Sequence, residues 1–328
     1  MSGSMARSEG MYPGLIRDIS EAKSLDEVID IVPEIGQRVE SVPCLMEVDG
    51  VVQELPKRKI IRNAETGTPY SIVTDQYGMS NHRDFFQICG EMLKHGATLD
   101  TAGTLADGGR TWIRMNMPEG TVLQDNGQDK VIPSFMLLSD HTSENANLGL
   151  PNIKRLSCNN ELTALIQGAI SKFSFRHRRW INERVSLAGK LMAESVTGIN
   201  STLELFQVMA SKRLSGGIFT DFAVALLNEH RGVSEQVDEY GVKTIHAKRA
   251  NDIDELVSYF ESGNQGAGDT CWGAYQSVTG WLDHKHEQLE DGKATRKKLE
   301  SMWSSNLMGD GARLKARAFK KLENFVTR

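Results

Sequence analysis

The hydrophobic pattern of this chain changes its period near Asn160. Before that residue, apolar residues alternate with polar ones or form short runs bounded by turn residues, as they do in strands. After it, they recur every three to four positions, as in amphipathic helices. This order predicts an α+β fold, with an antiparallel β-sheet-rich first half packed with helices and a mainly α-helical second half. We expect a flexible N-terminus over 1–20, a β-rich region over 21–158 and a helical region over 159–328; the last two could also form one continuous domain.

Turn signals define the hairpins of the first half. Asp49-Gly50 separates Cys44–Val48 from Val51–Leu55, and such a dipeptide between β-prone runs is the strongest short hairpin signal. Ser24 followed by Glu27 is a capping-box pattern that predicts the start of a helix. The other expected elements are a hairpin of Lys59–Arg62 with Tyr70–Thr74, a helix over Asn81–His95, a half-buried strand over Thr111–Met117 and a hairpin of Thr121–Leu123 with Val131–Leu138.

Apolar stripes predict the helices of the second half, each with one buried and one exposed face. Ser215–Gly217 and Ser262–Gly268 are rich in glycine and serine, so we expect loops there. The stripes begin at Leu162, Val185, Ile253, Trp272 and Leu314, and the last comprises Leu314, Ala318, Leu322 and Phe325.

Composition excludes several classes of protein. Of the 328 residues, 39% are hydrophobic and 25% charged, which is typical of a globular chain rather than a disordered one. The apolar runs are far shorter than the ~18 residues of a membrane helix, and no charged-then-apolar leader opens the chain. The cysteines form no Cys-x-x-Cys pair, which disfavours a zinc knuckle or a redox pair. We therefore expect a cytoplasmic protein without membrane contact, metal or cofactor.

Charge is distributed unevenly along the chain. Residues 1–150 carry 13 basic and 22 acidic residues, whereas residues 151–328 carry 25 and 21. A first basic cluster interleaves aromatic rings with its charges, and guanidinium groups bind phosphates while such rings stack on bases. If helical, it places Lys172, Arg176 and Arg179 on one face; alternatively it is the solvated surface of a helix end. Its candidate nucleic-acid-binding residues are Lys172, Phe175, Arg176, Arg178, Arg179, Trp180 and Arg184.

A second basic cluster lies on the last predicted helix. Arg313, Arg317, Lys320 and Lys321 fall within one sector of a helical projection, separate from the apolar stripe. No acidic residue at i±4 neutralises them, so they should repel one another unless an acidic group covers them. That group is either phosphate or the chain's own acidic half. These residues extend the candidate nucleic-acid surface, and a favourable interaction with the helix dipole is the alternative explanation.

Motifs for catalysis and metal binding are absent. The sequence contains neither a phosphate-binding loop nor His-Glu-x-x-His. His284 and His286 would point about 200° apart on a helix, so they cannot share one ion there. Asp140 and His141 are sequence neighbours, which is not the geometry of a catalytic triad. We therefore assign no catalytic and no metal-ligating residue.

Several blocks of the chain resemble a known family. Arg155-x-x-Cys158-x-Asn160-x-Leu162 is similar to the central R-x-x-C-x-N-x-L pattern of the phage and plasmid-like proteins grouped as domain-of-unknown-function family 932. Further blocks resemble that family in the same order, so the resemblance covers roughly residues 55–325. These blocks are Thr68–Phe86, Gly103 to Met117, Cys271–His284 and Gly309–Phe319.

The chain also departs from the family pattern. Gln276-Ser277 and Gly280-Trp281 stand where the family usually has Asn-Ala and Glu-Tyr, and its N-terminal Trp-Gly block is not recognisable near Val42–Gly50. The resemblance implies a divergent member, encoded by a phage, prophage or plasmid and acting in the bacterial cytoplasm. Genes of this kind often lie in replication and recombination regions. Phage annealing proteins have a comparable build of sheet plus helices, which is an analogy of fold.

Three functions remain open on the sequence. We expect first a non-catalytic, oligomeric protein that binds single-stranded DNA and anneals it in recombination or replication. The sequence does not distinguish DNA from RNA as its ligand. The second is a protein-interaction module without nucleic-acid binding. The third is a nucleic-acid-processing enzyme, whose site would be assembled from Asp140, His141, Arg155, Asn160, Asp283 and His284. In the alternative interpretation, Arg155, Cys158 and Asn160 form a buried polar joint between sheet and helix.

Overall fold

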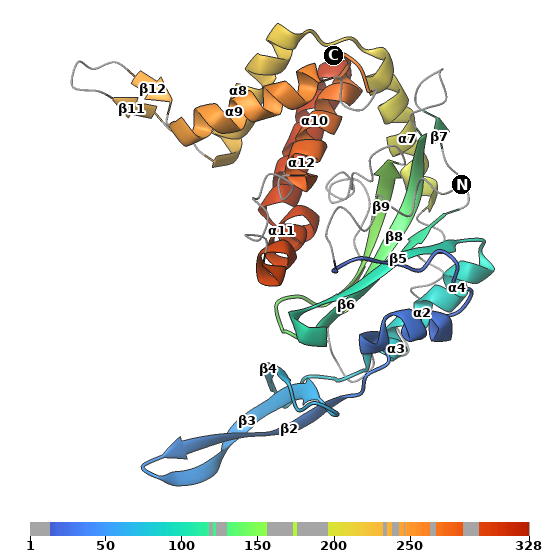
Figure 1. Ribbon diagram of the computed structural model, residues 1–328, viewed down its shortest axis with the longest axis vertical. Coiled ribbons are helices and arrows are strands. Elements are labelled where there is room, and N and C mark those ends of the chain that lie inside the picture. Colours follow the sequence, from blue (N-terminus) through green and yellow to red (C-terminus); the bar gives the residue numbers. More distant parts are fainter. Residues whose placement is uncertain are drawn as a thin grey trace. The chain divides into compact units, whose positions relative to one another are not determined.

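The computed structural model describes the chain in segments and divides it into two compact units. Unit 1 comprises Met1–Glu119, Pro133–Asn152 and Ser171–Thr197, and unit 2 comprises Gly120–Ile132, Ile153–Ile170 and Gly198–Arg328. Antiparallel sheet dominates the first half and helices the second, so the predicted α+β class is confirmed (Figure 1). The described residues are 14–117, 121–122, 130–155, 173–175, 196–231, 235–237, 243–245, 247–262, 267–284 and 295–327.

The largest sheet has the strand order β1-β5-β6-β8-β9-β10, and β7 pairs with the first residues of β8. The pairs β1–β5, β5–β6, β6–β8 and β9–β10 are antiparallel. The pairing of β7 with β8 confirms the hairpin predicted there. The strands are β1 (Arg17–Asp18), β5 (Thr98–Leu105), β6 (Arg110–Asn116), β7 (Thr121–Val122), β8 (Lys130–Asp140), β9 (Asn147–Arg155) and β10 (Phe173–Phe175).

Strand β6 is buried on both faces, so the prediction of a half-buried strand is wrong. The face expected to meet water carries Arg114, whose Nε lies 2.6 Å from Asp100 Oδ2. Asn116 donates to the same carboxylate, at 3.1 Å. A buried guanidinium with a charged partner is tolerated where a lone one is not. Apolar and polar residues alternate as the sequence indicates. The ion pair with Asp100, which allows the polar face to be buried, cannot be read from that alternation.

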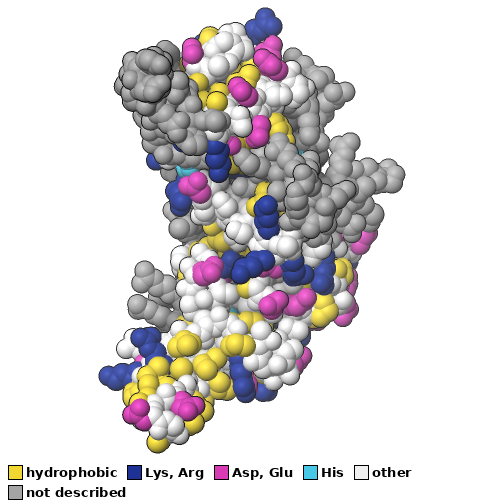
Figure 2. Space-filling model, turned by 60° about the vertical axis from the view of Figure 1, so that its left-hand side comes forward, with side chains coloured by type: hydrophobic (Ala, Val, Ile, Leu, Met, Phe, Trp, Pro, Cys, Tyr) yellow, Lys and Arg dark blue, Asp and Glu magenta, His cyan; other side chains and the backbone are white. Residues whose placement is uncertain are grey.

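A second sheet in unit 1 consists of β2 (Val39–Val48), β3 (Val51–Asn63) and β4 (Pro69–Thr74), in that order. Asp49 and Gly50 both have positive φ, 52° and 78°, as a type I′ turn requires, so the predicted hairpin is confirmed. Val39, Ile61 and Val73 form a small core at the end of the sheet remote from this turn. Near the turn, apolar side chains lie exposed, and they colour the lower end of Figure 2 yellow.

Short helices complete unit 1: α2 (Leu25–Ile31), α3 (His82–Phe86) and α4 (Ile88–Lys94), with a 3-10 turn at Pro33–Ile35. Ser24 Oγ accepts from Glu27 N at 3.3 Å, which confirms the predicted helix start. The single helix expected over Asn81–His95 is two helices, divided at Gln87. Residues 14–20, assigned on sequence to a flexible N-terminus, include β1 and the buried side chains of Leu15, Ile16 and Ile19.

Unit 2 is built around α10, whose residues are all buried from Cys271 to Asp283. It packs against α9, α11 and α12 (Figure 1). The sequence predicts an amphipathic helix with one exposed face here, and that prediction is wrong because both faces of α10 are buried. The elements of the unit are α7 (Val196–Ser211), α8 (Gly216–Arg231), α9 (Ala247–Glu261), α10 (Cys271–Asp283), α11 (Arg296–Met308) and α12 (Asp310–Val326), with β11 (Glu235–Val237) paired to β12 (Lys243–Ile245).

Helix α8 occupies part of a predicted loop. Gly216 and Gly217 begin the helix rather than interrupt the chain, so the loop predicted over Ser215–Gly217 is wrong for these two residues. The helix is held by its apolar face, because the Phe219 ring stacks on Phe260 of α9 with centroids 4.1 Å apart. None of the helices in the described part of the chain is both long and apolar enough to cross a membrane.

Candidate functional site

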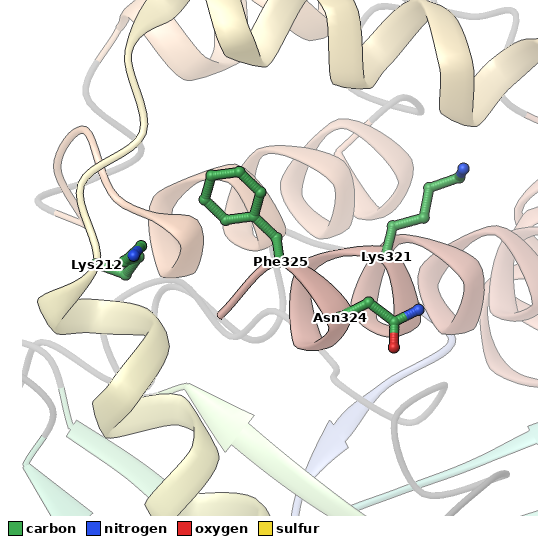
Figure 3. Close-up of a pocket in the computed structure, with 4 residues that line it drawn as sticks. All are labelled: Lys212, Lys321, Asn324 and Phe325. Carbon is green, nitrogen blue, oxygen red and sulfur yellow. The ribbon is translucent and has the colours of Figure 1, made fainter. Parts of the chain in front are cut away.

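A pocket in unit 2 lies between the end of α7 and the last turns of α12. Lys212, Lys321, Asn324 and Phe325 line it, and its volume is about 600 Å³. The Phe325 ring lies between the two lysines, with Lys212 on the chain that leaves α7 and the other residues on α12 (Figure 3). The pocket therefore combines an aromatic ring, an amide and ammonium groups.

Phe325 is predicted on sequence to end a buried stripe, and that prediction is wrong. Leu314, Ala318 and Leu322 are buried as expected, but Phe325, in the last turn of the helix, remains 40% exposed. The Lys212 Nζ lies 6.0 Å from the centre of its ring, at the outer limit of a cation–π contact. An exposed ring with a cation beside it can stack on a flat ligand that carries negative charge.

Lys212 is held in place by its backbone. Its carbonyl accepts from Cys271 N at 2.9 Å, and its N–H donates to Val208 O at 3.2 Å. Leu214 N donates to Asp269 O at 3.0 Å, so the turn after α7 is tied to the start of α10. No carboxylate of the described residues pairs with the Lys212 ammonium group, which is exposed. Hydrogen bonds thus fix the backbone of Lys212, and its side chain carries a positive charge into solvent.

The basic residues predicted on α12 are present on its exposed side, but carboxylates pair with three of the four. Arg313 pairs with Asp310 at 3.1 Å and Lys320 with Glu323 at 2.7 Å, each three residues away. Arg317 donates to the Glu229 carbonyl oxygen of α8. The expected unneutralised face is therefore wrong, because the acidic and carbonyl partners stand at i±3 and on another helix rather than at i±4.

Among the predicted residues that the structure describes, Lys321 also lines the pocket, and it pairs with the Glu229 carboxylate at 2.5 Å. The hydrogen bond from Lys321 and its charge lower the pKa of Glu229. The carboxylate therefore stays ionised in mildly acidic solution and competes with any anion for Lys321. Because surface ion pairs are weak, a phosphate can displace it.

If the pocket binds a single-stranded oligonucleotide, replacing Glu229 by glutamine should strengthen that binding by roughly twofold to fivefold. Since the pKa lies below the ordinary 4.5, the variant should keep its advantage at about pH 5 and lose it in more acidic solution, where wild-type Glu229 takes up a proton. Anisotropy titrations of both proteins at two pH values measure this. Equal affinities at neutral pH would contradict it.

The first basic cluster falls mostly outside the described residues. Of Phe175 only the backbone is described, in β10, which pairs with β9. Phe173–Phe175 is thus a strand, and the helix considered for this cluster does not extend through it. The members outside the described residues are Lys172, Arg176, Arg178, Arg179, Trp180 and Arg184.

A buried polar cluster in unit 1 contains the predicted Asp140 and His141. His82 Nδ1 lies 2.8 Å from Ser139 Oγ, and its Nε2 lies 2.9 Å from the carbonyl oxygen of Gly108. His141 Nδ1 lies 3.0 Å from the Tyr77 hydroxyl, and the two imidazole rings are 4.6 Å apart. Both histidines and the serine are buried. The serine and the histidine of this pair are both buried, and their hydrogen bond joins β8 to α3.

Asp140 is satisfied by its own neighbours. Its carboxylate accepts from Arg110 Nε at 2.8 Å, from the backbone and hydroxyl of Thr142 at 2.7 and 2.6 Å, and from Asn145 at 3.0 Å. Glu144 binds the other end of the same guanidinium. A carboxylate with this many donors serves to hold the turn after β8 against β6.

Asp283 and His284 belong to unit 2, where they end α10. Asp283 Oδ1 lies 2.5 Å from Lys315 Nζ, and both side chains are buried. Burial raises the pKa of Tyr275 well above its usual range, and the charge of Asp283 adds to this. Asp283 therefore has a packing role in its own unit. Of the other residues grouped with it, Asn160 and the side chain of Arg155 lie outside the described residues, as does Cys158 of the alternative polar joint.

The chain thus combines antiparallel sheet and helices with a pocket lined by basic, amide and aromatic side chains. The described residues contain no cluster of side chains able to hold a metal ion. A sequence profile described as "Domain of unknown function (DUF932)" matches residues 69–303. The chain belongs to this family, as the block pattern predicted. No curated protein and no solved structure matches it significantly. The matched range extends from β4 into α11, and it leaves the β2–β3 hairpin and α12 outside.

Proposed function

We propose that this chain binds single-stranded nucleic acid without catalysis, and that the Lys212–Phe325 pocket is one of its contacts. The observation that carries the proposal is the exposed Phe325 ring beside a lysine that pairs with no carboxylate of the described residues. Every base has a face that stacks on an aromatic ring, and ammonium groups bind the adjoining phosphates, so this combination suits a single strand of any sequence. A role in recombination or replication, with annealing of strands, is the wider form of this proposal.

The charge of the rest of the unit limits the affinity. The acids at Asp310, Glu323 and Glu229 compensate most of the positive charge of α12. Binding then depends on stacking and on few phosphate contacts, rather than on a continuous basic track. We therefore expect a single strand to bind more tightly than a duplex, whose bases are stacked on one another and closed to Phe325.

Substituting the pocket residues should weaken binding in distinguishable ways. Phe325→Ala removes a stacking platform and should reduce affinity by about 5- to 100-fold, with an unchanged salt slope. Lys212→Ala removes one cation and should flatten the plot of log affinity against log salt by about 0.7. Fluorescence anisotropy with a labelled single strand of about 40 nucleotides, titrated at several salt concentrations, measures both.

Lys297→Ala is a matched control, because Lys297 is exposed on α11 of the same unit and does not line the pocket. It should leave the affinity and the slope unchanged. If wild-type protein fails to bind at low salt, the proposal is wrong. If it binds and both pocket variants bind equally well, the pocket is not the contact.

A second candidate function is binding of another protein chain without nucleic acid. One observation favours it, namely the exposed apolar side chains at the end of the β2–β3 hairpin. Absence of nucleic-acid binding together with self-association would select this alternative.

A further inference from the structure

The end of the β2–β3 hairpin is a two-stranded ribbon that no described residue of its own unit covers. All residues from Leu45 to Glu54 are exposed. Among them are five apolar side chains, and Leu45, Val51 and Val52 are 61%, 63% and 64% exposed. An isolated two-stranded hairpin is only marginally stable in water, and apolar side chains in a contiguous group usually mark a contact surface. This ribbon therefore has the character of an interface.

The strand register determines which side chains share a face. Leu45 lies opposite Glu54 and Glu47 opposite Val52, so these four residues form one face of the ribbon. Met46, Val48, Val51 and Gln53 form the other. On the first face, each apolar side chain lies directly across from a carboxylate. That face would suit a surface with an apolar centre and basic groups at its edge.

The same hairpin carries basic side chains a few residues further along the strand. The tip near the turn carries Glu47, Asp49 and Glu54, and the stem carries Lys57 and Arg58. These five residues are exposed, and none of them has an ion-pair partner among the described residues. Among the described residues of one chain, neither the acidic tip nor the basic stem has an ion-pair partner.

We propose that this ribbon binds the same ribbon of a second copy of the chain, antiparallel about a two-fold axis. Such an axis places the acidic tip of each copy over the basic stem of the other and packs Leu45 and Val52 between them. Pro43 and Pro56 lack an N–H, which disfavours an extended edge-to-edge ladder and favours contact through the faces. Nucleic acid is a poor occupant, because the acidic tip would repel phosphate. The inference does not depend on nucleic-acid binding.

Charge reversal tests the symmetry of this contact. Glu47→Lys/Glu54→Lys makes tip and stem both positive, and Lys57→Glu/Arg58→Glu makes both negative, so each variant alone should be monomeric. Mixed in equal amounts, they should form a heterodimer, because unlike ribbons then face each other. Sedimentation velocity from about 1 to 200 µM suits the weak dimer expected of so narrow an interface. Restoration by mixing cannot be explained by misfolding of either variant.

Apolar substitutions assign the face. Leu45→Ser/Val52→Ser should weaken the wild-type dimer at least tenfold, and Met46→Ser/Val51→Ser should weaken it less. The proposal is overturned if wild-type protein is monomeric at all concentrations, if the reversed variants still dimerise, or if mixing them restores nothing. A larger loss with the second apolar pair would overturn the assignment of the face.

Discussion

Replacing Lys315 by methionine should lower the free energy of unfolding by about 3–5 kcal/mol. Lys315 Nζ and Asp283 Oδ1 are 2.5 Å apart, and the two side chains are 0% and 3% exposed. Methionine fills most of the volume of the lysine stem but leaves the carboxylate in an apolar interior without this cation. Removing one member of a buried pair is costly because the other member cannot regain its hydration.

Urea denaturation at neutral pH measures this loss as a lower midpoint at unchanged slope. Lys320→Met is the matched control, because its pair with Glu323 is exposed, and it should cost less than about 1 kcal/mol. Asp283→Leu combined with Lys315→Met removes both charges and should recover much of the loss. If Lys315→Met were as stable as Lys320→Met, the assignment of a buried ion pair would be contradicted.

The same pair affects how functional assays are interpreted. Asp283 lies in a block that resembles the family, and the sequence places it among the residues of a possible enzyme site. Since Asp283→Ala would remove this carboxylate from the buried Lys315 ammonium group, lost activity in that variant would not separate a catalytic role from a loss of stability. The variants Phe325→Ala and Lys212→Ala avoid this difficulty because both residues are exposed.

Local chemistry made some elements predictable from sequence. The Asp49-Gly50 turn and the Ser24 cap depend on residues within a few positions of each other, and both are confirmed. Helix α10 shows the limit of this approach. Gln276, Ser277 and Asp283 fall outside its predicted apolar stripe, yet all three are buried, and Asp283 is paired through Lys315 from another helix. A periodic pattern shows which residues are polar, but it does not show which polar side chains form hydrogen bonds or ion pairs that allow them to be buried.

The candidate site was only partly predictable for the same reason. The charge pattern of one helix identifies Lys321, whereas Lys212 is far away in sequence and was not predicted. Phe325 matches the period of a buried stripe, but burial also requires a neighbour that covers the ring, and in the last turn of α12 the ring stays 40% exposed. Glu229 neutralises Lys321 across two helices, which no spacing rule within α12 could reveal. A Lys-Arg pair directly after a helical stripe was the only sequence signal for Lys212.

Replacing Gly273 by alanine should destabilise the protein by roughly 3–4 kcal/mol, the sum of an overpacked contact and a weakened helix cap. A Cβ at this position would lie 1.9 Å from the carbonyl oxygen of Gly268. That oxygen accepts from Thr270 N, and the Thr270 hydroxyl in turn accepts from Gly273 N at 3.0 Å. The loop cannot move away without breaking the cap that starts α10.

Gly90→Ala is the control of opposite sign. Gly90 lies exposed in α4, and an added methyl group there would meet no described atom within 4 Å, so alanine should stabilise the protein by about 0.5–1 kcal/mol through helix propensity. Thermal and urea unfolding of both variants compare the same chemical change in two helices. A Gly273→Ala protein as stable as wild type would contradict the close contact. If the loss is found, the Trp272-Gly273 part of the family-like block is explained by the packing of α10 against its own entry loop, and it needs no ligand to account for it.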